Sequence, residues 1–577
     1  MEQSQMVAAI VKCNQLIAQK PEKAELHAQL GNLYAQQQQW PSAIASYQRA
    51  IQLDATVATV YYNLANVLSK IGEMQQAADF LYQGLQLDPT LGTVQKYQAL
   101  AEFFQEGKPE RAIVCWQQAI ALQADCWQAY YQLGMVWQRQ QQWSQAVTAY
   151  EQVKQINPQF IPNLQQLAKV YRTLGKYESA IDCYHQLLRL AQVGTTIERE
   201  ALENYQQILE TMPQPTVQLY EQLGTLLRAK GYFSEALTAF QKAIAINPHF
   251  ALAHINIQYT PANAEDLDKL IEFYRNLVEA TPGIPIAWGN LGDALTQKNL
   301  TSEAIACYRK SSYQQAINRY PHLTQLDWSK TKQLPPDFAI IGASKSGTSS
   351  LYRYLSEHPQ ILLPHKKELD FFLRYFEQGI DWYLAHFPSI CDRSDFITGE
   401  ATPNYLRFPV VPQRIKQCCP QLKLIVLLRN PVERAVSWHY HKLNTGLAKG
   451  DLASAIATER ERLQNLSAAE LSAGGYHNPD NLLSSLYVYQ LQPWIELLGR
   501  ERFLILKSED FYDHTADVMQ RVFDFLGLPD CFLENYPQVN VGYYPPIDDN
   551  LRNTLVEYFQ PYNQQLEAFL GMKFNWN

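Results

Sequence analysis

The sequence lacks several features that would place it in a common class at once. It has no excess of basic residues, because 48 Lys and Arg stand against 56 Asp and Glu for a net charge of −8. That balance argues against general binding to nucleic acid or to an anionic membrane surface. No stretch approaches the roughly 18 apolar residues that a membrane-spanning helix needs, and the longest candidate, Leu422 to Leu428, has only the length of a strand. We therefore expect neither a nucleic-acid partner nor a membrane span.

Signals for secretion and for metal binding are missing as well. The N-terminus, MEQSQMVAAIVKCNQLIAQK, has an acidic second residue and no basic segment ahead of an apolar one. The nine cysteines contain no CxxC pair, and the adjacent Cys418 and Cys419 do not have the spacing of zinc ligands. We expect a cytoplasmic protein with reduced thiols and no metal.

What is present first is a repeat, with a period of about 34 residues. A leucine followed by a small residue recurs at Leu30-Gly31, Leu64-Ala65, Leu133-Gly134, Leu167-Ala168, Leu223-Gly224 and Leu291-Gly292. An alanine follows twelve positions after each small residue, and an aromatic residue follows most of these alanines, at Tyr47, Tyr150, Tyr184, Phe240 and Tyr308. Small residues let paired helices approach while the aromatic rings fill the space beside them. The pattern predicts an all-α solenoid of helix pairs.

These residues resemble the tetratricopeptide repeat, as in LGNLYAQQQQWPSAIASYQRAIQLD. The resemblance covers residues 24–318, about eight units, with a capping helix predicted over 1–23 and an irregular hairpin near 189–216. It implies a concave groove that binds a protein or peptide partner. A spacer or a dimerisation arm is the alternative.

The pattern changes after Tyr320. The segment TKQLPPDFAIIGASKSGTSSLYRYLSEHP reads as a linker with two prolines, a short strand, a loop of small residues and a helix. Further strands are predicted at Leu422–Leu428 and Phe503–Leu506, with helices between them at Val432–Lys442 and Leu482–Leu498. We predict a linker over 319–336 and an α/β domain with a central parallel sheet over 337–577.

The loop GASKSGTSS has the composition of an anion site, because its small residues let backbone N–H groups and the following helix N-terminus face one ligand. It differs from a nucleotide-kinase P-loop, GxxxxGK[ST]. Gly342 and Gly347 have the right spacing, but Thr348 stands where the lysine belongs and Lys345 lies inside the loop.

With the rest of the domain, this P-loop-like segment resembles the sulfotransferases that use 3′-phosphoadenosine 5′-phosphosulfate (PAPS), particularly the glycan-modifying branch that includes heparan sulfate sulfotransferases. The match is spread over SKSGTSSL, KELDFF, GEATPNY, LIVLLRNPVERAVSWHYH, FLILKSEDF, DFLGLP and GYYPPI. Each segment alone is weak, but their order and spacing together are specific.

That resemblance implies PAPS as the donor. Lys345 would contact the bridging region of the phosphosulfate, and Arg429 with Ser437 would bind the 3′-phosphate. A strand-end guanidinium suits this role because it offers a bidentate fork, although an ion pair between Arg429 and Glu433 is the alternative. Further donor contacts are implied at Ser344, Ser346, Gly347, Thr348, Ser349, Ser350, Ser485, Tyr487, Gly542 and Tyr543. Arg434, by contrast, is expected to be solvated.

For the chemistry, the resemblance makes Glu368 the base and Lys345 the group that stabilises the leaving phosphate. A solvated charge in the run HKKEL is the alternative for Glu368. Many glycan-sulfating relatives have a histidine two residues later, where this sequence has Asp370; His365 is a possible substitute, although a structural histidine is the more common case. Acceptor contacts are implied at Lys367, Asp370, Glu400, Thr402 and Asn404.

The resulting hypothesis is an enzyme that transfers a sulfuryl group from PAPS to a hydroxyl or amine of a glycan, without a metal. Protein tyrosine is the alternative acceptor. A nucleotide kinase and a repeat scaffold with an inactive sulfotransferase-like domain are the alternative functions. Because the repeats bury their own core, we expect a fragment that starts near Lys330 to fold and to bind donor.

Overall fold

The computed structural model describes residues 2–325, 327–328, 333–389, 396–444, 447–473, 480–531, 533–539, 542 and 544–576. The chain divides into two compact units, Met1–Pro215 and Thr216–Asn577. None of the helices within these ranges is long and apolar enough to cross a membrane.

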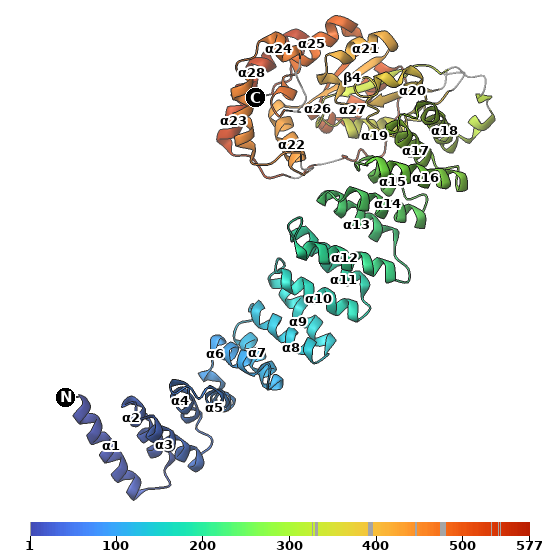
Figure 1. Cartoon of the computed structure of the whole chain (residues 1–577). Coiled ribbons are helices and arrows are strands. Elements are labelled where there is room, and N and C mark those ends of the chain that lie inside the picture. The colour runs from blue at the N-terminus through green and yellow to red at the C-terminus, as the bar shows by residue number, and fades with distance from the viewer. Residues whose placement is uncertain are drawn as a thin grey trace. The chain divides into compact units, whose positions relative to one another are not determined.

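The first unit consists of helices that pack as successive pairs (Figure 1). They are α1 (Glu2–Gln19), α2 (Ala24–Gln36), α3 (Trp40–Leu53), α4 (Ala58–Lys70), α5 (Met74–Leu87), α6 (Val94–Phe104), α7 (Pro109–Leu122), α8 (Trp127–Arg139), α9 (Trp143–Ile156), α10 (Ile161–Thr173), α11 (Tyr177–Leu190) and α12 (Thr196–Thr211). A Cβ atom added to Gly31 would lie 2.6 Å from the ring of Tyr47, and one added to Gly134 would lie 2.5 Å from that of Tyr150. The recurring glycine therefore makes room for the recurring aromatic ring.

The predicted irregular hairpin near 189–216 is a single helix, α12, instead. The hydroxyl of Thr195 caps it by accepting a hydrogen bond from the N–H of Glu198. The unit ends shortly after this helix, at Pro215.

The second unit begins with six more helices of the solenoid. These are α13 (Val217–Lys230), α14 (Phe233–Ile246), α15 (Ala251–Gln258), α16 (Ala264–Ala280), α17 (Pro285–Gln297) and α18 (Thr301–Arg319). The same close approach recurs here, because Gly292 faces the ring of Tyr308 as Gly224 faces that of Phe240.

The rest of this unit is an α/β domain built on a five-stranded sheet of order β2-β3-β1-β4-β5, in which every neighbouring pair is parallel. The strands are β1 (Phe338–Gly342), β2 (Ile361–Leu362), β3 (Ile397–Ala401), β4 (Lys423–Leu428) and β5 (Phe503–Lys507). The sheet confirms the fold class expected from the sequence. Parallel strands bring their carboxyl ends to one edge, where ligands of open α/β sheets bind.

Helices surround this sheet (Figure 1). They are α19 (Thr348–Glu357), α20 (Ile380–Leu384), α21 (Val410–Cys418), α22 (Pro431–Asn444), α23 (Leu452–Leu463), α24 (Ala468–Ala473), α25 (Tyr487–Leu498), α26 (Ser508–Asp513), α27 (Thr515–Leu526) and α28 (Asp549–Leu570). One core packs side chains of α19, α26 and α27 against β1 and β4.

The last repeat shares buried contacts with the α/β domain. The ring of Tyr308 stacks on that of His386 at 3.8 Å and meets Trp382 edge-on at 5.5 Å. The indole of Trp382 donates to the hydroxyl of Thr296 at 2.9 Å. All four side chains are buried. The sequence-based boundary at 319–336 stays a prediction; it marks where the repeat pattern stops, and the packing continues across it.

Candidate functional site

The loop between β1 and α19 contains two residues with left-handed backbone conformations. Lys345 has a φ of 71° and Gly347 a φ of 94°, so two left-handed residues flank Ser346. A Cβ at Gly347 would also lie 2.7 Å from the hydroxyl of Tyr512, which leaves no room for a side chain. α19 begins at the next residue, Thr348. Successive turned amides followed by a helix N-terminus favour an anion.

Positive side chains gather around this loop. The pKa of Lys345 is lowered, first by burial and then by the positive charges of Lys367 and Arg429. Lys367 donates to the hydroxyl of Ser349 at 2.9 Å, and Arg429 Nη1 donates to the backbone carbonyl of Lys345 at 3.2 Å. Like charges held this close raise one another's free energy, so a bound anion would relieve the repulsion.

Arg429 follows the last residue of β4 and is held there by two tyrosines. Tyr487 donates its buried hydroxyl to the carbonyl of Arg429 at 2.9 Å, and Arg429 Nη2 donates to the hydroxyl of Tyr544 at 3.3 Å. The alternative partner, Glu433, instead accepts a hydrogen bond from Arg552 at 2.6 Å. The guanidinium of Arg429 therefore lies beside the loop.

Glu368 lies beside Lys367, whose ammonium also donates to the hydroxyl of Ser349. Its backbone has a φ of 65°, and its N–H donates to the carbonyl of Ala401 at the end of β3 at 2.9 Å. Its side chain remains 41% exposed, with the ammonium of Lys367 3.5 Å from Oε1. A carboxylate that is fixed at its backbone and open to the solvent side has the access that a general base needs.

The two residues weighed as helpers of Glu368 are placed differently. Asp370 is turned toward Arg374, 3.5 Å away, and burial raises its pKa. The half-buried ring of His365 packs beside the stacked rings of Tyr308 and His386, with centroids 5.9 and 5.8 Å away, and burial lowers its pKa to about 3. This packing gives His365 a structural role in the contact with the last repeat.

Two of the three residues predicted in GEATPNY lie beneath the site. Glu400 is fully buried, and burial raises its pKa to about 7. It accepts hydrogen bonds from the hydroxyls of Tyr383 at 2.8 Å, Thr402 at 2.7 Å and Tyr405 at 3.3 Å. Asn404 accepts a weak hydrogen bond from Ser344 at 3.4 Å and lines the surface. Glu400 and Thr402 therefore support the strand end that carries Asn404.

The expectation that Arg434 is solvated is wrong. Its guanidinium is 1% exposed and donates to the hydroxyl of Ser485 and to the carbonyl of Asn481, each at 2.6 Å. Arg434 lies on the buried face of α22. Its charge had led us to expect an exposed position. Ser485, predicted as a donor contact, bonds to Arg434 in this buried cluster.

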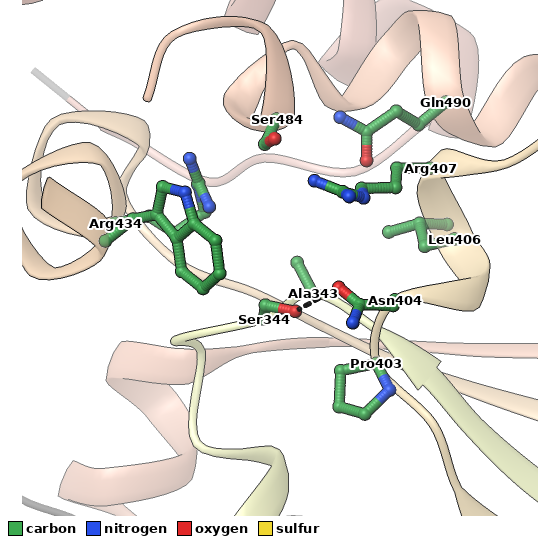
Figure 2. Close-up of a pocket in the computed structure, with 10 residues that line it drawn as sticks. Ala343, Ser344, Pro403, Asn404, Leu406, Arg407, Arg434, Ser484 and Gln490 are labelled. Atoms are coloured by element: carbon green, nitrogen blue, oxygen red, sulfur yellow. Dashed lines mark hydrogen bonds between the residues drawn. The ribbon is translucent and has the colours of Figure 1, made fainter. Parts of the chain in front are cut away.

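Arg434 and Arg407 also border a small pocket directly behind the loop (Figure 2). The pocket has a volume of about 10 Å³, with Ser344 and Asn404 on the loop side and Gln490 on the other. A space of this size holds one water molecule. It is too small for a substrate.

A much larger cleft of about 1550 Å³ also borders the loop. The predicted residues that line it are Ser344, Lys345, Gly347, Thr348, Ser349, Lys367, Glu368, Asn404, Arg429, Ser437 and Gly542. Ser346 of the loop and Ser350 of α19 are fully buried. Tyr543 lies outside the described residues.

Sequence reasoning missed two cleft residues on α22, Trp438 and His441. Burial and the nearby Lys345 lower the pKa of His441, and Glu368 opposes that shift. The signal was available: Glu433, Ser437 and His441 follow one another at intervals of four residues, so they share one helix face. All three line the cleft.

Comparison with known proteins identifies the parts of the chain. Residues 335–537 match the family model for the sulfotransferase domain. Residues 31–72, 58–91, 127–160, 164–192, 217–250 and 286–321 match models of the tetratricopeptide repeat. This is a tetratricopeptide-repeat solenoid fused to a sulfotransferase domain. The resemblance stated from the sequence is confirmed.

Several curated relatives share the sulfotransferase part. The chain is 26% identical over 313 residues to the membrane-associated sulfotransferase kil1 of Dictyostelium discoideum, covering 42% of this chain and 66% of that protein. It is 26% identical over 285 residues to the bifunctional heparan sulfate N-deacetylase/N-sulfotransferase 4 of Mus musculus, and 28% identical over 279 residues to enzyme 2 of the same name from Homo sapiens. In each of these two the match spans 31% of the relative's length.

Among solved structures, the sulfotransferase from Alicyclobacillus acidocaldarius is 28% identical, with a TM-score of 0.35. It covers 42% of this chain and 98% of its own.

Proposed function

We propose that the sulfotransferase domain transfers a sulfuryl group from PAPS to a hydroxyl or amine of a glycan. The main support is the cluster of Lys345, Lys367 and Arg429 around a loop that leads into the N-terminus of α19. PAPS carries phosphate at the 3′ position and a phosphosulfate at the 5′ position, so it needs positive charge at two places. Arg429 with Ser437 suits the first, and the loop with Lys345 suits the second.

In this proposal Glu368 accepts the proton of the acceptor hydroxyl or amine as its oxygen or nitrogen attacks sulfur. The new bond to sulfur forms as the bond between sulfur and the bridging phosphate oxygen breaks, and that oxygen leaves with the bonding electron pair. Lys345 stabilises the negative charge that develops on it. Lys367 contacts both Glu368 and the hydroxyl of Ser349. In this scheme it therefore lies between the base and the donor.

No step in this scheme needs a metal, since cationic side chains and the helix N-terminus supply the positive charge.

The acceptor class is inferred from relatives, because two of those described above are named as heparan sulfate N-deacetylase/N-sulfotransferases. Labelled PAPS incubated with the full chain and a fractionated cell extract tests both donor and acceptor. We expect label in the carbohydrate fraction. Label in protein would favour tyrosine sulfation. Absence of transfer together with hydrolysis of a nucleoside triphosphate would favour a kinase, and absence of both would leave an inactive scaffold.

We also propose that the first unit binds a polypeptide partner in the groove of its helix pairs, since solenoids of this kind present an extended concave surface. Cytoplasmic location stays a prediction, and one relative bears the name membrane-associated. Cell fractionation, followed by detection of the chain in each fraction, tests it.

A further inference from the structure

One side of the large cleft is built from the repeats of the second unit. These lining residues lie on α13, α14, α15 and the turns that follow α13 and α15: Thr225, Arg228, Ala229, Lys230, Gly231, Phe233, Asn256, Tyr259 and Pro261. They share the cleft with Lys345, Glu368 and Arg429. The end of the solenoid and the sulfotransferase domain thus border the same space.

The position of Tyr259 on this wall is closely fixed. It is the residue after the last turn of α15, and its N–H donates to the carbonyl of Asn256 at 3.3 Å. The same carbonyl accepts from the buried hydroxyl of Thr260 at 2.7 Å and from Arg228 Nη1 of α13 at 3.2 Å. Three donors at one carbonyl tie this end of α15 to the neighbouring helix.

The side chain of Tyr259 extends from that fixed point into the cleft. It is 60% exposed, which is unusual for so large a ring. Its pKa is nevertheless raised, first by burial and then by the negative charge of Glu368, and Lys366 opposes the shift. A large exposed fraction and a raised pKa are both expected for a side chain that lines a cleft, because it has solvent on its faces and protein around it. Its hydroxyl lies within electrostatic reach of Glu368.

We propose that the wall formed by α13–α15 is part of the acceptor site and that Tyr259 contacts the acceptor opposite Glu368. The inference rests on the function proposed above and assigns part of the acceptor binding to the repeats.

Size supports this assignment. Pockets for a single small ligand have volumes of about 300–1,000 Å³, whereas this cleft has about 1550 Å³. A donor at the loop therefore leaves room along the wall. An acceptor chain that runs past Glu368 would meet Tyr259.

The chemistry of the wall favours a polysaccharide. A tyrosine offers a flat apolar face and a polar hydroxyl at its edge, which suits a sugar ring with C–H groups on one face and hydroxyls around it. Arg228 adds positive charge at the same wall, held by the carbonyl of Asn256. An acidic saccharide would meet complementary charge there.

The test uses the full chain with Tyr259→Ala and Tyr259→Phe. Leu252→Ala is the matched control, because Leu252 is 47% exposed on the same helix. Transfer of label from PAPS is measured over a range of concentrations of the polysaccharide fraction of a cell extract. Affinity for adenosine 3′,5′-bisphosphate is measured by calorimetry.

For Tyr259→Ala we expect KM for the polysaccharide to rise about 3- to 10-fold, the usual effect of losing one aromatic contact, with donor affinity unchanged. Tyr259→Phe should recover most of this loss, and Leu252→Ala should match the native chain. An unchanged KM in Tyr259→Ala overturns the proposal, as does a loss of donor affinity, which would place Tyr259 in the donor site or in the fold.

The native chain separates this inference from the proposed function. If it transfers no label to any fraction, the proposed function fails. If it labels carbohydrate normally and Tyr259→Ala has no effect, only the proposal that α13–α15 form part of the acceptor site is refuted. Label that enters protein instead of carbohydrate refutes the polysaccharide acceptor.

Discussion

Removing all repeats should weaken the sulfotransferase domain, although the sequence predicts that a fragment from Lys330 folds and binds donor. The perturbation is a pair of fragments, 216–577 and 330–577. The first keeps the whole second unit, and the second loses α13–α18. The side chains of Trp382 and His386 are each 1% exposed in the intact chain. The shorter fragment lacks Tyr308, which packs on both of them, so they become more exposed to solvent.

The cost can be worked from these contacts. If about half of the ~200 Å² that a buried tryptophan covers returns to water, the loss is about 2.5 kcal/mol. The hydrogen bond from Trp382 to Thr296 contributes about 1 kcal/mol net. With the exposure of His386, the expected destabilisation is about 3–5 kcal/mol, a large share of the 5–15 kcal/mol typical of a domain. For this size of fragment it lowers Tm by about 6–20 °C.

Calorimetric melting of both fragments, with and without adenosine 3′,5′-bisphosphate, measures the difference. Thr296→Val in fragment 216–577 is the matched control, because it removes only the hydroxyl that bonds to Trp382 and Tyr308 and keeps the helices. It should cost about 1–3 kcal/mol, since the buried indole N–H of Trp382 loses its acceptor. Equal Tm values for the two fragments would show that the last repeat contributes nothing to the stability of the domain. The free energy of unfolding assigned above to the contacts of Trp382 and His386 would then be incorrect.

Three further predictions concern the site. Lys345→Ala and Arg429→Ala should each weaken binding of adenosine 3′,5′-bisphosphate by about 1.5–3 kcal/mol, and unchanged affinity in calorimetry would mean that the nucleotide is wrongly placed. Glu368→Gln should lower turnover by about 10²–10⁴-fold with donor affinity retained, and Asp370→Asn should do less; the reverse order in a rate assay would move the base to Asp370. Because the folded-state pKa of Glu400 is about 7, above about 4.3 when unfolded, its contribution to stability is complete below pH 4 and is lost as pH rises to 7. Glu400→Gln should therefore reduce the fall in the free energy of unfolding between low and neutral pH by about 2–4 kcal/mol. Urea unfolding at pH 5 and 8 measures that fall, and an equal fall in both proteins would contradict the prediction.

The parts of the molecule that could be predicted from the sequence are those set by local pattern. The interval between Gly31 and Tyr47 recurs along the solenoid because a short-range contact requires it. The strand, loop and helix around Lys345 are contiguous in the chain, so composition and order were sufficient there. The resemblance then added Glu368 and Arg429, and the structure places both at the cleft.

What could not be predicted depends on contacts between distant segments. Arg434 is buried because Ser485 and Asn481, about 50 residues later, supply acceptors. Nothing near Arg434 in the sequence indicates this. Tyr259 presents a similar case, since only the fold brings the end of α15 to the same cleft as Glu368.

The contact between the last repeat and the sulfotransferase domain also bears on why the two are fused. A solenoid needs a cap, because the outer face of its final helix has no following repeat to cover it. Here Tyr308, at the repeat's own aromatic position, packs on His386 and Trp382, so the α/β domain covers α18.

The same repeat also contacts the segment HKKEL, which contains Glu368. Asp293 of α17 accepts a hydrogen bond from Lys366 at 2.7 Å, and a Cβ at Gly289 would lie 2.2 Å from the ring of His365. Both side chains in HKKEL that the repeat contacts lie within three residues of Glu368. Without these contacts, Glu368 should be free to move relative to the loop that contains Lys345. Loss of the repeats should therefore reduce turnover more than donor affinity.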